Sequence, residues 1–289
     1  MHYADYRTIL SPKNGMNIYR GCSHGCIYCD SRSLCYQINH DFEDIEVKRN
    51  AALILDSQLR RKRKPCMIST GAMCDPYIHL ESELQVSRQC LEVIEKQGFG
   101  LAILTKSARI LRDLDILKRI DYSAKCVVQI TLTTYDEDLC KKIEPHVSTT
   151  AERVSVLEAI KDEGIPTVVW LSPVLPFIND TEENLLGLLD YCIRAGVRGI
   201  LCFGFGVTMR EGNREYFYKK LDELFPGIKQ KYITRFGGAY ECTSLNNNKL
   251  MDIFESKCKQ HGILYKTDEV FAYLRDFKPK EPQMSMFVD

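Results

Sequence analysis

Short apolar runs alternate with amphipathic segments along most of this chain, at intervals of about 30 residues. The apolar runs, rich in β-branched residues, predict strands at 16–19, 66–70, 101–105, 126–133, 167–171 and 199–205. The amphipathic segments predict helices at 47–61, 83–97, 110–120, 151–163, 182–195 and 214–224. Strands this apolar are typical of parallel sheets that are buried on both faces. The pattern therefore predicts an α/β protein of six βα units, whose right-handed crossovers curl the sheet into a full or partial barrel.

The alternation changes after Gly227. Residues 229–232 and 246–262 predict two helices, and 263–266 predict a short strand. The stretch 278–282, with two prolines, is expected to be exposed and loosely ordered. We therefore predict a core barrel over residues 1–227 and an α/β extension over 228–289 that packs on it.

Composition excludes several classes of protein. Lys+Arg and Asp+Glu both total 39, so no overall field attracts nucleic acid or an anionic membrane. No run of about 18 apolar residues occurs, so a membrane span is not expected. Thirteen cysteines without a secretory signal fit a reducing compartment. We expect a cytoplasmic protein, and the sequence gives no sign of an obligate oligomer.

The most specific chemical signal is a cysteine loop about twenty residues from the start. Cys22, Cys26 and Cys29 follow the spacing C-x3-C-x2-C, and Gly21 and Gly25 permit positive φ angles in so short a loop. Thiolates select zinc, copper(I) or iron–sulfur clusters. Three thiolates are one short of a closed site, so this set leaves a coordination position open for chemistry. The alternative is a zinc loop, with His24, Cys35 or a distant cysteine as the fourth ligand.

Polar residues also recur where the predicted strands end, which is where barrel enzymes place their sites. Small hydroxyls and a glycine end the second strand, a lysine follows the third, two threonines share one face of the fourth, and an arginine begins the next helix. These residues are Ser69, Thr70, Gly71, Lys106, Thr131, Thr133 and Arg153.

The cysteine spacing, with an aromatic residue before the third cysteine, resembles the signature of the radical S-adenosylmethionine (SAM) superfamily. The order of further motifs narrows the resemblance to the spore photoproduct lyase-like family, described as DNA repair photolyase-like. These motifs are 75–77 with Glu81, 104–106, 143–145 with Arg153, and 173–180, and the similarity runs from about Met16 to Phe205. The resemblance implies a partial (β/α)6 barrel.

The resemblance also implies roles for individual residues. Cys22, Cys26 and Cys29 would bind three irons of a 4Fe–4S cluster, and SAM would chelate the fourth iron. Tyr28 would pack near the adenine, and the hydroxyls and backbone of residues 69–71 would accept the methionyl ammonium. The other expected SAM contacts are Cys74, Lys106, Thr131, Thr133 and Arg153.

The implied reaction begins with a flavodoxin- or ferredoxin-type one-electron donor. Reductive cleavage of SAM would give methionine and a 5′-deoxyadenosyl radical, which abstracts hydrogen from an unidentified substrate; nucleic acid is the class that the family implies. The alternative from another class is a non-catalytic zinc or iron–sulfur protein that binds nucleic acid. A third is a family member that binds SAM but serves as an electron carrier or scaffold.

The chain departs from the lyase at two positions. Ala72 and Asp30 stand where that enzyme has the cysteine and the tyrosine that return a hydrogen atom. Neither side chain donates a hydrogen atom, so repair of spore photoproduct is not predicted. Cys74 and Tyr77 are the candidates for a relocated catalytic relay.

Two basic regions are candidates for a nucleic-acid surface. Residues 60–64 are the densest basic run, but they end a predicted helix just before a strand, away from the expected site. Residues 219–220 and 229–235, with tyrosines interleaved, are the better candidate because they follow the sixth strand. The tyrosines are Tyr216, Tyr218 and Tyr232.

Overall fold

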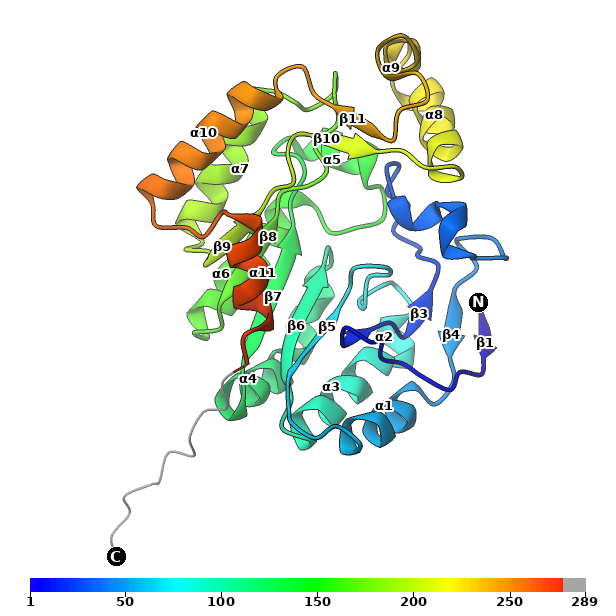
Figure 1. The fold of residues 1–289 in the computed structure, drawn as a ribbon, viewed down its shortest axis with the longest axis vertical. Helices are drawn as coiled ribbons and strands as arrows, with labels where there is room; N and C mark the ends of the chain where they lie inside the picture. Colours follow the sequence, from blue (N-terminus) through cyan, green and yellow to red (C-terminus); the bar gives the residue numbers. More distant parts are fainter. Residues whose placement is uncertain (278–289) are drawn as a thin grey trace, which may run out of the picture.

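A computed structural model describes residues 1–277 (Figure 1). Its centre is a six-stranded, all-parallel sheet in which the strands lie side by side in chain order. The strands are β2 (Gly15–Met16), β5 (Met67–Thr70), β6 (Gly100–Thr105), β7 (Cys126–Thr131), β8 (Thr167–Trp170) and β9 (Gly199–Leu201). The predicted α/β fold, a partial (β/α)6 barrel, is confirmed.

Both faces of the sheet are buried, which explains the uninterrupted apolar runs. All residues of β6 and β7 are buried. Leu101 and Ile103 belong to the core between the sheet and the outer helices, whereas Ala102 belongs to a separate cluster on the inner face. Val270 and Leu274 of α11 (Thr267–Arg275) pack in that inner cluster. The C-terminal helix thus fills part of the inner face of the barrel.

The remaining elements surround this sheet. The helices are α1 (Ala51–Arg60), α2 (Glu81–Leu84), α3 (Val86–Lys96), α4 (Leu114–Ser123), α5 (Glu137–Ile143), α6 (Thr150–Asp162), α7 (Glu182–Arg194), α8 (Asn213–Leu224), α9 (Ile228–Phe236) and α10 (Asn247–Gln260). The short strands are β1 (His2–Ala4), β3 (Tyr19–Arg20), β4 (Glu46–Lys48), β10 (Gly206–Thr208) and β11 (Glu241–Thr243). Three 3-10 turns span Asp30–Arg32, Leu34–Tyr36 and Ala108–Asp113.

Several predicted boundaries were wrong. The helix predicted at 47–61 starts only at Ala51, because 46–48 form β4 between β1 and β3 and Asn50 turns with a φ of 55°. The last strand ends at Leu201, because Gly204 turns with a φ of +94° before β10 begins. Residues 263–266 contribute a single bridge, between Leu264 and Gly199, instead of a strand.

The C-terminal region contains more helix than the sequence pattern predicts. Beyond Gly227 the chain forms α9, β11, α10 and α11, and β11 pairs with β10 from before the predicted domain boundary. The α10 helix packs on α7 (Figure 1). The expectation for 278–282 lies outside the described residues. Among those described, no helix has both the length and the apolar character needed to cross a bilayer.

Candidate active site

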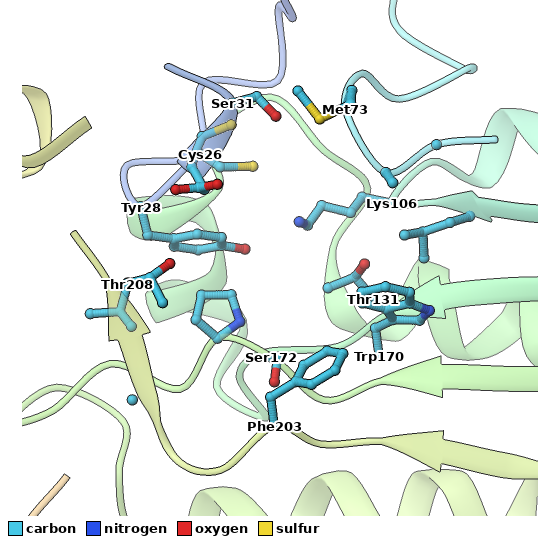
Figure 2. A pocket seen from close by; sticks show the side chains of 18 of the residues that line it. Cys26, Tyr28, Ser31, Met73, Lys106, Thr131, Trp170, Ser172, Phe203 and Thr208 are labelled. Atoms are coloured by element: carbon cyan, nitrogen blue, oxygen red, sulfur yellow. The ribbon is translucent and has the colours of Figure 1, made fainter. Parts of the chain in front are cut away.

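A cavity of about 680 Å³ lies at the carboxyl ends of the parallel strands. The cysteine loop forms one wall, and the segments that follow the strands form the others (Figure 2). The predicted site residues that line it are Cys22, Cys26, Tyr28, Cys29, Gly71, Cys74, Lys106 and Thr131. One cavity therefore brings together residues from the loop and from three successive strands.

Backbone hydrogen bonds to two distant segments of the chain hold the cysteine loop. The Cys22 amide donates to the Phe42 carbonyl at 3.0 Å, and the Ile27 amide donates to the Ile143 carbonyl at 3.0 Å. Gly21 has a φ of +81°, and any Cβ there would clash with the Phe42 carbonyl oxygen. Glycine is required at this position because both the backbone angle and the close approach exclude a side chain.

The spacing of the sulfurs indicates what the loop can bind. Within residues 1–277, the sulfurs of Cys22, Cys26 and Cys29 do not all come within 4.8 Å of one another. A single tetrahedral zinc with Zn–S bonds of about 2.3 Å would need sulfurs about 3.8 Å apart. Cys35 is exposed and does not line the cavity. Cys35 therefore does not complete a four-ligand zinc site at this wall.

The thiols differ in their electrostatic surroundings. Burial raises the pKa of Cys26 and of Cys29. A hydrogen bond from the Cys74 thiol lowers the pKa of Cys22, and the same bond raises the pKa of Cys74. Cys74 therefore lines the cavity as a protonated thiol beside the first cysteine of the loop.

Glu144 is the centre of a buried charged group next to the cysteine loop. Its Oε2 accepts from Arg153 Nη2 at 2.5 Å, its Oε1 lies 3.8 Å from Lys106 Nζ, and it also accepts from the Tyr28 hydroxyl. Burial alone would raise the pKa of Glu144, but Arg153 and Lys106 outweigh it and lower the pKa. Burial likewise opposes the charge of Lys106, whose pKa is nevertheless raised by Cys26 and Glu144. The group holds Lys106 charged at the cavity wall.

The prediction that Arg153 contacts SAM is not supported by its position. Its side chain is fully buried behind the cavity, and Nη1 donates to the Thr131 carbonyl at 2.7 Å. The guanidinium is therefore fully engaged with Glu144 and the end of β7. Arg153 is a positioning residue for Tyr28 and Lys106.

Asp75 links the loop after β5 to the end of β6. Its Oδ1 accepts from the Tyr77 amide at 2.8 Å and from the Thr105 hydroxyl at 2.7 Å. Its Oδ2 accepts from the Lys106 amide at 2.7 Å and lies 3.5 Å from His24 Nδ1. The carboxylate thus fixes the backbone of Lys106 and faces the cysteine loop.

Four other predicted residues lie outside the cavity lining. Tyr77 was predicted to be catalytic, but it is fully buried and its hydroxyl donates to Asp113 Oδ2 at 3.1 Å, because the turn at Asp75 directs it into the core. Thr133 lies beyond the end of β7, where the strand alternation no longer applies. Ser69 and Thr70 stop short of the cavity; Gly71 reaches it, with a φ of +100° and no room for a Cβ against the Leu104 carbonyl.

Sequence reasoning missed the aromatic wall of the cavity. Trp170 ends β8 and Phe203 follows β9, with their ring centroids 5.7 Å apart. Figure 2 shows them across the cavity from Cys26 and Tyr28. Trp170 Nε1 donates to Gln129 Oε1 at 2.8 Å, whereas Phe203 is 56% exposed. Aromatic residues at two successive strand ends were the available signal.

Asp30 joins a polar group at the edge of the cavity. Its Oδ2 accepts from the Tyr36 hydroxyl at 2.7 Å and from Arg210 Nη1 at 3.1 Å. Arg210 Nη2 also donates to the Tyr240 hydroxyl at 2.9 Å. Asp30 therefore holds one arginine and one tyrosine, and the arginine in turn holds a second tyrosine.

The two basic regions predicted as nucleic-acid surfaces lie in different parts of the structure. Residues 60–64 begin with the last residue of α1 and precede β5, so they lie at the amino end of the sheet, away from the cavity. The tyrosines expected on the second surface face inward: Tyr232 is fully buried, and Tyr216 covers the Arg32 guanidinium at 3.7 Å. Lys220 and Lys229 pair with Glu223 and Asp222, each at 2.6 Å.

Comparison with known sequences shows a family model and several relatives that this chain matches. A sequence model of the radical SAM superfamily matches residues 16–189. An uncharacterized protein of Mycobacterium tuberculosis is 30% identical over 223 residues, which cover 75% of this chain and 65% of that protein. A radical SAM Nalpha-GlyT isomerase of Pseudomonas phage M6 is 22% identical over 181 residues, covering 61% and 35% of the two chains. The chain thus spans less than two thirds of the length of these relatives.

Comparison with solved structures shows a shared fold. Spore photoproduct lyase complexed with dinucleoside spore photoproduct superposes with a TM-score of 0.62 at 13% identity, covering 86% of this chain and 74% of that one. Streptococcus suis SuiB bound to S-adenosylmethionine superposes with a TM-score of 0.52 at 12% identity, covering 92% and 49%. At these identities the likeness establishes the fold alone.

Proposed function

The chain belongs to the radical SAM superfamily, and we propose that it is an enzyme that binds a 4Fe–4S cluster through Cys22, Cys26 and Cys29, with SAM beside them in the cavity. The observation that carries the proposal is the placing of three thiols on one wall of a cavity at the carboxyl edge of the sheet. The sulfur spacing and the absence of a fourth cysteine from the C-x3-C-x2-C loop fit a cluster with one open iron.

A cluster held by Cys22, Cys26 and Cys29, reduced by an external one-electron donor, would supply the reductive cleavage of SAM to methionine and a 5′-deoxyadenosyl radical. Lys106 offers a charged ammonium to an anionic group of a ligand, and Glu144 and Asp75 fix its position. Tyr28, held by Glu144, presents its ring to the cavity. Cys74 contributes a protonated thiol to the wall. These residues orient ligands and keep water from the reacting atoms.

The first experiment is anaerobic reconstitution followed by reduction with dithionite in the presence of SAM. We expect a brown protein with about four irons per chain that forms 5′-deoxyadenosine. A colourless protein with one zinc would favour the non-catalytic alternative. Iron without cleavage of SAM would favour an electron carrier or scaffold.

For the substrate, we propose a nucleotide within nucleic acid, whose base stacks on Phe203. The ring of Phe203 is exposed and packs against Trp170 on one side. Such a ring can stack with any base, whatever the nucleotide sequence. Tyr36 lines the cavity, and Arg210 donates to its hydroxyl and to that of Tyr240; tyrosine and arginine are residue types that contact nucleic-acid strands. The lyase with the same fold is complexed with a dinucleoside spore photoproduct.

Replacement of Phe203 tests this substrate class. Trp170 is the single tryptophan of the chain, so its fluorescence reports entry of a base into the cavity. Short single-stranded DNA and RNA should quench it, and Phe203→Ala should weaken binding about 5- to 150-fold, because stacking on an aromatic ring contributes about 1–3 kcal/mol per base. Tyr122→Ala, at an exposed tyrosine of α4, is the matched control. Equal affinities for Phe203→Ala and wild type, with SAM present, would rule out the stacking surface.

A further inference from the structure

A second group of metal-ligand residues lies outside the cavity. One ligand atom each from His2, His40 and Asp44 come within 4.8 Å of one another. None of these three residues lines the cavity, and neither the motifs nor the proposed reaction uses them. They come from β1 and from the loop that precedes β4, at the edge of the molecule that carries the amino terminus (Figure 1).

The fold places these residues together through the small sheet. The β1 and β4 strands are parallel, with His2 in register with Glu46. The Asp44 amide donates to the Asp41 carbonyl at 2.9 Å, which forms a turn in the loop. This turn brings Asp44 and His40 to the side of β1 that carries His2, whose ring lies edge-on to that of His40 at 4.9 Å.

Each ring offers one nitrogen to a metal, His40 directly and His2 by releasing a proton. His40 Nδ1 lies 2.9 Å from the Asp41 carbonyl, so Nδ1 carries the proton and Nε2 is the acceptor. This Nε2 is buried and has no hydrogen-bond partner. A carboxylate only accepts, so His2 Nδ1, 2.9 Å from Asp44 Oδ2, donates its proton to that oxygen when no metal is bound. A metal between these two atoms would displace that proton, and Nε2, 3.7 Å from Glu46 Oε2, would then carry the ring proton. In metal sites the second ring nitrogen of a histidine ligand usually donates to such a carbonyl or carboxylate.

We propose that His2 Nδ1, His40 Nε2 and Asp44 Oδ2 bind a zinc ion, with water at the fourth position. Two imidazoles and one carboxylate form a ligand set that suits a first-row divalent metal. His2 and Asp44 are 40% and 43% exposed, so an ion reaches the site directly from solvent. Met1 N lies 2.9 Å from the other oxygen, Asp44 Oδ1, so Oδ2 is the oxygen that faces His2 Nδ1.

The site would brace the cysteine loop. Phe42 lies between His40 and Asp44 in the chain, and its carbonyl accepts the Cys22 amide and contacts Gly21. A metal that ties His40 and Asp44 to β1 therefore fixes the segment against which the first cysteine rests. The zinc site is independent of the proposed reaction, since no ligand is shared with the cavity.

The test is zinc binding by the reconstituted full chain, tagged only at its carboxyl end. Zinc chloride is titrated anaerobically, and binding is measured by calorimetry and by metal analysis after desalting. We expect one zinc per chain, with His40→Ala and Asp44→Asn each weakening binding at least about tenfold. His261→Ala, in the turn after α10, is the matched control and should bind zinc as the wild type does. Zinc should also raise the melting temperature of the wild type and not that of His40→Ala.

The cysteines require a separate control because free thiolates also bind zinc. In the triple variant Cys22→Ala/Cys26→Ala/Cys29→Ala, adding His40→Ala should weaken zinc binding by the same factor as it does in the wild type. The zinc measurement then depends neither on the cluster nor on catalytic activity. Equal zinc affinity with and without His40, or no zinc bound by the wild type, overturns the proposal. His2→Asn provides a further variant should His40→Ala fail to fold.

Discussion

Alanine at Cys22, Cys26 or Cys29 is expected to abolish iron binding and the cleavage of SAM. Each sulfur occupies a separate place on the cavity wall, and the described residues bring no other cysteine of the loop region into the lining. Removal of one cysteine leaves the cluster with only two protein ligands, and we expect two to be too few to retain it. Iron should fall from about four atoms per chain to below about one, and formation of 5′-deoxyadenosine should fall to the level without enzyme.

Two further variants separate ligand loss from damage to the fold. Cys35→Ala removes an exposed thiol outside the cavity, and it should leave iron content and SAM cleavage unchanged. Cys74→Ala removes a thiol that lines the cavity beside Cys22, and it should retain iron. A Cys26→Ala protein that still carries four irons and cleaves SAM would contradict the ligand assignment.

Glu144→Gln is expected to cause the largest loss of stability among single polar substitutions in this site. Glutamine cannot neutralise Arg153, which is fully buried, or Lys106. Removal of one partner from a buried ion pair costs about 3–5 kcal/mol, because the remaining charge stays desolvated. The loss should appear as a lower urea midpoint, and SAM binding should weaken as Tyr28 and Lys106 lose their support. Glu163→Gln, which removes a partly exposed ion pair with Lys118, should cost about 0–1 kcal/mol.

The same carboxylate should make stability depend on pH. The net effect of Arg153 and Lys106 holds the pKa of Glu144 below its usual value, although burial opposes this. The unfolded chain therefore takes up its proton first, so the stabilisation is present above about pH 4.3 and is lost as the pH falls through the folded value. Glu144→Gln should flatten this part of the stability profile. Parallel profiles for wild type and Glu144→Gln between pH 3 and 5 would show that the group is not charged in the folded protein.

The local pattern of the chain was sufficient for the architecture and for the cysteines. Parallel strands buried on both faces are mostly apolar along their length, so β6 and β7 can be predicted from their apolar runs alone. A three-cysteine loop needs only short-range spacing, and Gly21 is required by its own φ angle. Lys106 lines the cavity because it directly follows a long, regular strand, and its contact with SAM stays a prediction.

Only the tertiary structure decided which polar residues reach the cavity. Arg153 and Tyr77 have the chemistry of ligand-binding groups, but Glu144 and Asp113 hold them in the interior. The aromatic wall and the His2, His40 and Asp44 group join residues that are distant in the chain. Strand alternation and residue spacing describe neighbours within one element. Contacts between elements depend on how loops turn and on which buried charges find partners, and the one-dimensional pattern does not carry that information.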